Sequence, residues 1–161
     1  MSKVGRVMQA LGVVLLAAFA AQAPAQQPPP YGPDINIETA KKAAAAAVAE
    51  CTNNKWKMAV AVVDTHGSLV YFERINDTQI ASVKIAQDKA NAAAQYRRPT
   101  RIWEDAMAKG RIAVVTLAGV VASPGGVPIV NDGKVIGAIG ASGGTGDQDE
   151  QCSKAGAEAV K

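Results

Sequence analysis

The protein has 161 residues, of which 48% are hydrophobic, 19% are charged and 4% are aromatic, and its formal net charge is +3. This length suits one domain of ordinary size with a short appendage, and it leaves room for a hydrophobic core. Two Cys and a single His exclude a zinc finger, a zinc ribbon and a His-rich metal site, because such sites need several N or S ligands close together.

The first 25 residues have the features of a secretory signal peptide. A positively charged start with Lys3 and Arg6 precedes an apolar run of about eleven residues. The small residues Ala23 and Ala25 predict cleavage before Gln26, with cleavage after Ala23 as the alternative. The apolar run is shorter than the roughly 20 residues that span a bilayer. We therefore expect an exported protein, periplasmic or secreted, with no stable membrane anchor after cleavage.

The chain that remains after cleavage is nearly neutral. Removal of residues 1–25 takes away two of the 17 basic side chains and none of the 14 acidic ones. This balance argues against a nucleic-acid partner, which would need clustered Lys and Arg. Residues 26–35, which begin QQPPPYGP, form a Pro-rich leader that should be extended and exposed as a spacer.

An amphipathic helix is predicted directly after the leader. Asp34 or Asn36 can cap its start, and residues 52–54 (TNN) end it. Apolar residues recur at helical spacing and form one face of this segment: Ala40, Ala44, Ala47, Val48 and Cys51.

A β-hairpin and a second helix come next. Residues 58–64 and 68–74 are rich in β-branched side chains, and the connection over 65–67 ends in Gly, which suits a hairpin. Residues 76–78 (NDT) offer caps for the second helix, which Pro99 ends. The apolar face of this helix is expected to contain Ile80, Val83, Ala86, Ala90, Ala93 and Ala94.

The last third of the chain predicts two further helices and a second hairpin. Thr100 can cap a short third helix, and residues 111–122 form either a strand or a buried turn. Residues 127–130 and 134–141 then form strands around an Asn-Asp-Gly turn. A closing helix follows the Gly-rich stretch at 142–147.

Two hairpins separated by helices predict the α+β class, an antiparallel sheet with helices packed on its faces. The even number of cysteines in an exported chain favours a disulfide between Cys51 and Cys152. Because Cys51 ends the first helix and Cys152 lies near the start of the last one, this bond requires the two helices to be antiparallel neighbours.

Three segments together resemble a known family. They are VVDTHGSLVYFERINDT, QDKANAAAQYRRPT and PGGVPIVNDGKVIGAIGASGGTGDQDEQC. They resemble the GlcG/HbpS family of haem-binding proteins, and the likeness extends over the expected domain at 36–161. It implies a profilin-like or PAS-like fold that forms homo-oligomers and binds haem or a related tetrapyrrole for storage, sensing or detoxification. A haem-degrading enzyme and a cofactor-free oligomeric interaction module are the alternatives, and haem degradation is the one activity that the resemblance suggests.

Few residues can ligate a haem iron, which takes His, Met, Cys or Tyr. The candidates are His66, at the predicted hairpin tip, and Met107, on the third helix. Each has a simpler interpretation, since His66 can be an exposed turn residue and Met107 can pack in the core. Arg98 and Thr100 lie in the motif RPT, where Arg98 can pair with a haem propionate.

Glycine-rich stretches supply the other candidate contacts. Gly125 and Gly126 allow close approach of a ligand or a neighbouring subunit. Ser142 and Gly143 precede the last helix, where free backbone amides can receive an anion such as a carboxylate. The stretch has no Gly-Lys-Ser/Thr, which argues against a nucleotide-binding P-loop.

Other catalytic patterns are poor matches. Ser142 lies in a G-x-S-x-G pattern at 140–144 (GASGG), but Asp64 and the single His66 are two residues apart in a predicted tight turn, which argues against the Ser-His-Asp triad of a serine hydrolase. The acidic pairs Glu104-Asp105 and Asp149-Glu150 are neighbours on predicted helices, so we expect them to point apart as surface charge.

Overall fold

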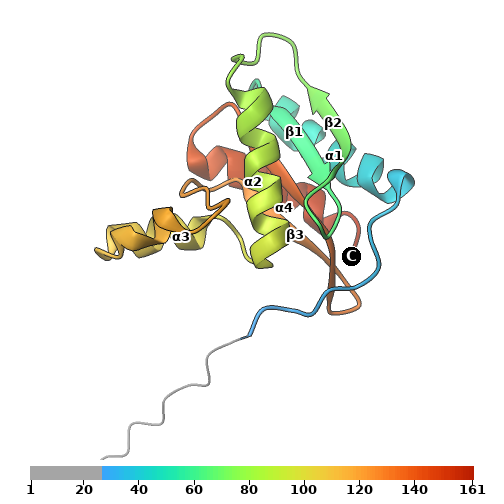
Figure 1. Cartoon of the computed structure of the whole chain (residues 1–161). Coiled ribbons are helices and arrows are strands. Elements are labelled where there is room, and N and C mark those ends of the chain that lie inside the picture. Colours follow the sequence, from blue (N-terminus) through green and yellow to red (C-terminus); the bar gives the residue numbers. More distant parts are fainter. Residues whose placement is uncertain (1–26) are drawn as a thin grey trace, which may run out of the picture.

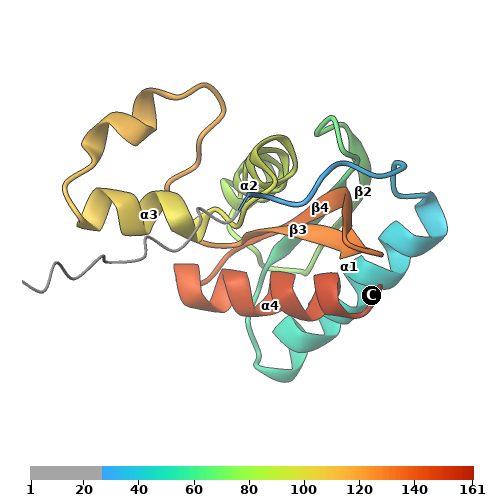
Figure 2. The ribbon, with the colours of Figure 1, turned by 90° about the horizontal axis from the view of Figure 1, so that it is seen from below.

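The computed structural model describes residues 27–161, so the predicted signal peptide lies outside the described residues. These residues form a four-stranded antiparallel sheet with helices on both faces (Figures 1 and 2). The strands are β1 (Ala59–Val63), β2 (Leu69–Arg74), β3 (Gly126–Asn131) and β4 (Lys134–Ser142). Their order in the sheet is β2-β1-β4-β3, so the two predicted hairpins pair through β1 and β4. The predicted α+β class is confirmed.

The two faces of the sheet are covered by different helices. These helices are α1 (Ile37–Asn53), α2 (Ser82–Tyr96) and α4 (Gly146–Glu158). In Figure 2, α1 and α4 lie side by side below the sheet and α2 crosses above it. Every residue of β1 is buried, because alternate side chains face the α1–α4 layer and the α2 layer.

Small side chains let the helices come close to the sheet. The layer between α2 and the sheet is built almost entirely of Ala, with Val63 and the half-buried Phe72 as larger members. At Gly140 of β4, an added Cβ would lie 2.2 Å from the carbonyl oxygen of Ala86 in α2. The low aromatic content therefore corresponds to a sheet and helices in nearly direct backbone contact.

The Pro-rich leader is largely exposed, as predicted, but it docks on the sheet instead of acting as a free spacer. Tyr31 forms a parallel bridge with Val135, at the end of β4 that β1 does not reach. The amide of Gly32 donates to the Val135 carbonyl over 2.8 Å, and the Tyr31 hydroxyl donates to the Gln95 carbonyl over 2.8 Å. The guanidinium of Arg97 lies 5.0 Å from the Tyr31 ring centroid and fixes the leader further.

Two predicted boundaries differ from the structure. The second helix begins at Ser82, because the Thr78 hydroxyl donates to the Ile75 carbonyl within a turn instead of capping a helix. As a result Ile80, predicted to lie on the buried face, is 86% exposed. The first helix begins as expected, since the side chain of Asn36 accepts a hydrogen bond from the Thr39 amide.

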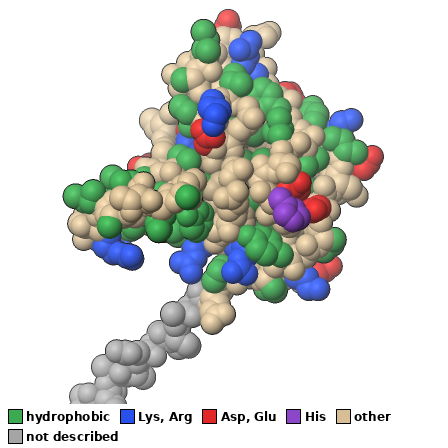
Figure 3. All heavy atoms as spheres, in the orientation of Figure 1, with side chains coloured by type: hydrophobic (Ala, Val, Ile, Leu, Met, Phe, Trp, Pro, Cys, Tyr) green, Lys and Arg blue, Asp and Glu red, His purple; other side chains and the backbone are tan. Residues whose placement is uncertain are grey.

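Residues 101–122 form an arm that projects from the body of the molecule (Figure 2). It contains α3 (Arg101–Ala108) and a short 3₁₀ helix, η1 (Ile112–Thr116). The expected strand or buried turn at 111–122 is therefore wrong, and of the residues in η1 only Val114 is buried. Hydrophobic side chains gather on the arm's surface, among them Ile112, Val115 and Leu117 (Figure 3).

Cys51 and Cys152 form a disulfide between α1 and α4, with their Cα atoms 5.6 Å apart. Both residues are fully buried, and Met58 contacts the Cys51 sulfur at 3.5 Å. The two helices pack as antiparallel neighbours, since Gly156 of α4 lies against the backbone of Ala43 in the first half of α1.

Candidate functional site

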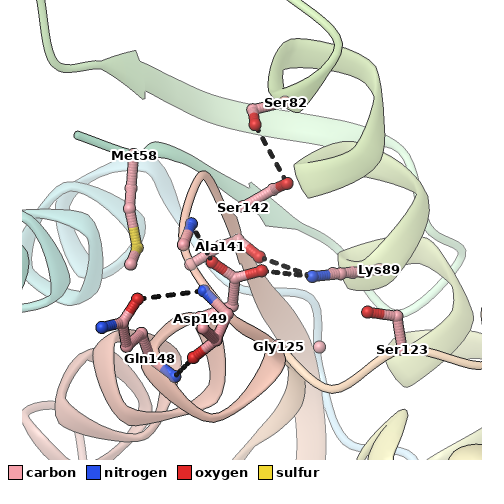
Figure 4. Close-up of polar contacts among 12 residues, drawn as sticks. Met58, Ser82, Lys89, Ser123, Gly125, Ala141, Ser142, Gln148 and Asp149 are labelled. Atoms are coloured by element: carbon pink, nitrogen blue, oxygen red, sulfur yellow. Dashed lines mark hydrogen bonds and ion pairs between the residues drawn. The ribbon is translucent and has the colours of Figure 1, made fainter. Parts of the chain in front are cut away.

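A buried ion pair joins α2 to α4 beneath the glycine-rich loops (Figure 4). Lys89 of α2 donates to a carboxylate oxygen of Asp149 over 2.6 Å and to the Ala141 carbonyl over 3.3 Å. The Lys89 and Asp149 side chains are 2% and 4% exposed. Burial of a charged pair is tolerated only where both partners are satisfied, so this pair fixes the local geometry closely.

The Asp149 carboxylate also holds the loop that leads into α4. The amide of Gly144 donates to its second oxygen over 2.9 Å. Desolvation raises the pKa of Asp149 above its ordinary value, while hydrogen bonds from Lys89 and from the amides of Gly144 and Gly143 act in the opposite direction. The loop and the two helices are thus tied together through one carboxylate.

The prediction that Asp149 and Glu150 are surface charges is wrong. Both are buried, and Glu150 accepts a hydrogen bond from Nε of Arg101 over 2.5 Å. Arg101 also pairs with Asp147, and the hydrogen bonds that it donates to the carboxylates of Asp147 and Glu150 raise the pKa of the guanidinium. The arm is therefore anchored to the start of α4 by charge.

Helical spacing contained a signal for both members of the buried pair. Asp149 lies three residues before Cys152 and seven before Gly156, so it shares their buried face. Lys89 lies three residues after Ala86 and four before Ala93, on the apolar face of α2. A charge on such a face predicts a buried partner of opposite charge, and this is the signal that identifies the pair.

Thr100, Gly125 and Gly126 meet in the same region, and their contacts are with the protein itself. The Thr100 hydroxyl donates to the Ser123 carbonyl over 2.7 Å and accepts from the Gly126 amide over 3.0 Å. A Cβ at Gly126 would lie 2.2 Å from the Lys89 carbonyl oxygen. The backbone that approaches Gly126 closely is therefore that of α2. A role of Thr100, Gly125 and Gly126 in ligand binding stays a prediction.

Ser142 lies on the side of the ion pair opposite to Gly125 (Figure 4), and Gly143 follows it in the chain. The buried Ser142 hydroxyl donates to the hydroxyl of Ser82 over 3.1 Å. Gly143 has φ +151°, and a Cβ there would lie 2.1 Å from the Lys57 carbonyl oxygen. Thr145 caps α4 with a capping box, so the helix start satisfies its own amides. Anion binding at these residues also stays a prediction.

The three arginines next to Pro99 have different surroundings. Arg97 donates to the Pro29 carbonyl, and Arg101 is paired with acids of α4. Arg98 is exposed and has no ion pair or side-chain hydrogen bond within residues 27–161. It lines a surface pocket of about 310 Å³ together with Gln27, Pro28, Pro29, Pro99 and Ile102. This pocket offers an apolar floor beside one unpaired cation.

The two candidate iron ligands are not brought together. His66 lies at the β1–β2 turn with its side chain 78% exposed, and the amide of Gln95 in α2 reaches its carbonyl. Met107 is 37% exposed on α3, in the arm that projects away from the sheet. Met107 shares α3 with Ile102, which lines the Arg98 pocket, whereas His66 belongs to none of the elements that line this pocket.

The fold and this set of contacts define a class of α+β domain seen in solved structures. The crystal structure of HbpS is 30% identical to this chain with a TM-score of 0.74, over 81% of this chain and 92% of the other. The crystal structure titled PduOC:Heme Complex is 25% identical with a TM-score of 0.72, over 80% of this chain and 96% of the other.

Sequence comparison defines the family more narrowly. Protein GlcG of Escherichia coli (strain K12) is 41% identical over 108 residues, which are 67% of this chain and 81% of that protein. Residues 35–158 match the family described as haem degrading protein HbpS-like. The chain belongs to this HbpS-like family, as the motifs in its sequence predict.

Proposed function

We propose that this protein is an exported haem-binding protein that stores, senses or detoxifies haem or a related tetrapyrrole. The observation that carries the proposal is the family match over 35–158, and the similar fold of PduOC, solved as a haem complex, supports it. The signal-like residues 1–25 support export. No helix within residues 27–161 is long and apolar enough to cross a membrane.

The surface around Arg98 fits part of a haem. The guanidinium of Arg98 matches a propionate carboxylate in geometry and charge, and Pro28, Pro99 and Ile102 supply an apolar floor. A pocket of about 310 Å³ is at the lower limit of the usual range for small-molecule sites, so it would hold one edge of the macrocycle. The rest of the ring would lie outside this pocket, and Met107, five residues beyond Ile102 on α3, is not among the residues that line it.

The residues of the protein would orient the group, while the chemistry that haem supplies when bound is redox chemistry at iron. Arg98 would hold a propionate, and the buried hydrogen bonds of Thr100 to Ser123 and Gly126 would keep the α2–α3 junction in place. This division resembles other sites in which a rigid inner layer positions residues at the surface.

A haem titration of the mature protein, residues 26–161, tests the proposal through the Soret spectrum. We expect a saturable shift at one haem per chain or fewer. Replacement Arg98→Ala should weaken binding, whereas Arg74→Ala, at the exposed end of β2, should not. Met107→Leu should change the band positions if the thioether ligates iron. A spectrum no different from that of an unrelated control protein would refute haem binding.

Haem degradation is the second candidate, and the family's description as haem-degrading favours it. It predicts that the Soret absorbance of the bound haem decays with release of iron when a reductant and oxygen are supplied. A haem-bound protein whose spectrum stays constant under these conditions acts in binding alone.

We also propose that the protein assembles with copies of itself through the arm. None of the residues of α3 is buried, and Ile112 of η1 is 66% exposed. Trp103 as a whole is half-buried, but its indole N–H is buried and has no hydrogen-bond partner within residues 27–161. Light scattering of the purified protein tests this, with Ile112→Asp expected to yield monomers and Ile80→Asp, at an exposed site outside the arm, to leave the assembly unchanged. A monomeric wild-type protein would refute it.

A further inference from the structure

The leader and the β1–β2 turn place three metal-binding side chains together at the surface. Asp34, Asp64 and His66 each offer one ligand atom, and these atoms all lie within 4.8 Å of one another. His66 is the single His of the chain. In Figure 3 it appears in purple with acidic side chains beside it. We propose that these residues bind a divalent transition-metal ion of the zinc class.

The two carboxylates are held in position by hydrogen bonds that each use only one oxygen. Oδ1 of Asp34 accepts from the amide of Thr65 over 3.0 Å and from its hydroxyl over 2.5 Å. Oδ1 of Asp64 accepts from the amides of His66 and Ser68 over 2.9 and 2.8 Å. In each case the second carboxylate oxygen makes no hydrogen bond within residues 27–161 and can ligate a metal.

The charge of the cluster is not balanced by the protein. Neither Asp34 nor Asp64 pairs with a Lys or Arg within the described part of the chain, and the Asp34–His66 contact is 3.7 Å long. Two fixed carboxylates without a cationic side chain beside them favour a bound cation. The imidazole favours zinc-class ions over magnesium or calcium, which prefer oxygen ligands alone.

The geometry needs a small adjustment to close around an ion. Ligand atoms at zinc distances of about 2.1 Å stand roughly 3.4 Å apart in a tetrahedron. The present separations, all within 4.8 Å, exceed this by at most about 1.4 Å. The His66 side chain is 78% exposed and its ring contacts only the Thr65 hydroxyl, at 3.3 Å, and Asp34, at 3.7 Å, so a small rotation of the ring can make most of this movement. Water would fill the fourth position.

Such an ion would join two segments that are 30 residues apart in the chain. Asp34 belongs to the leader, while Asp64 and His66 follow β1. The ion would therefore stabilise the docked leader. This role is separate from haem binding, because it uses neither Arg98 nor α3.

Calorimetric titration of the purified protein with Zn²⁺ tests the proposal, using protein without a histidine tag and without added haem. We expect one Zn²⁺ per chain and a higher melting temperature in its presence. His66→Ala and Asp34→Asn should each weaken binding by on the order of tenfold or more. The control is Asp132→Asn, in the exposed turn between β3 and β4, which should bind Zn²⁺ as the wild type does.

Four outcomes would overturn the proposal: no saturable binding, equal binding of Mg²⁺, unchanged affinity after His66→Ala, or unchanged affinity after Asp34→Asn. His66 is exposed at a turn, so its replacement should leave the fold intact, which a circular dichroism spectrum checks. Since the titration contains no haem, its result is independent of the haem-binding test.

Discussion

Removal of one partner of the Lys89–Asp149 pair should destabilise the protein strongly. In Lys89→Met the long side chain keeps its packing, but the Asp149 carboxylate loses the ammonium that lies 2.6 Å from it. Loss of one partner of a buried pair costs about 3–5 kcal/mol, because the other charge stays buried and uncompensated. We expect the lower end of this range, since the Gly144 amide still donates to Asp149.

A double-mutant cycle measures the interaction energy between Lys89 and Asp149 separately from the effect of replacing each side chain alone. Asp149→Asn keeps an acceptor for the Gly144 amide and leaves the Lys89 ammonium without its counter-charge. The double variant removes both charges, so it should be less destabilised than the sum of the single variants by about 2 kcal/mol or more. Urea unfolding followed by circular dichroism measures each free energy of unfolding.

The pair between Lys84 and Asp88 is the matched control on the same helix. It joins residues four apart, and its side chains are 77% and 41% exposed. Lys84→Met should therefore change the free energy of unfolding by less than about 1 kcal/mol. A similar effect of Lys84→Met and Lys89→Met, or strict additivity in the cycle, would show that the buried charges are not coupled.

Three further predictions concern single features of the fold. Gly126→Ala should cost about 1–3 kcal/mol in urea unfolding, because the added methyl group would lie 2.2 Å from a carbonyl oxygen of α2; wild-type stability would contradict this contact. Replacement of Cys51 and Cys152 by Ser should cost about 4 kcal/mol, as expected for a cross-link of 101 residues, and added reductant should then have no further effect. Hydrogen bonds from Thr65 lower the pKa of Asp34 below 3.8, so its stabilising contribution is present above 3.8 and is lost as the pH falls through the lowered value. Asp34→Asn should therefore reduce the loss of stability on acidification by less than about 1 kcal/mol, and an unchanged acid profile would refute this.

The sheet and its helices could be predicted because their signals are local. The turns at 65–67 and 131–133 have residues that favour hairpins, and alanines at helical spacing mark the buried faces of α1 and α2. The start of α2 could not be predicted in the same way. Thr78 is suitable as a cap and as a turn residue, and only the position of the Ile75 carbonyl decides between them.

The burial of the arm could not be predicted for a different reason. The apolar run at 111–122 was expected to be covered by its own chain, and within residues 27–161 most of it is not. A sequence shows that a side chain is apolar, but it does not show whether the chain itself or another copy covers it. The leader is exposed, as its prolines predict, but its docking could not be predicted, because the backbone hydrogen bonds of Pro30 and Gly32 are made with Val135, about 100 residues away in the chain.

The arginines at 97, 98 and 101 are close in sequence, but the backbone directs their side chains to different partners. Arg97 has φ +54° at the end of α2, which turns its side chain toward the leader. Arg101 begins α3 one turn later and faces the acids of α4. Arg98 lies between these two anchored neighbours, so its position is fixed while its charge stays unpaired within the described residues. A cation held in this way is suited to an anionic ligand, and for this reason Arg98→Ala is the most informative substitution for the haem proposal.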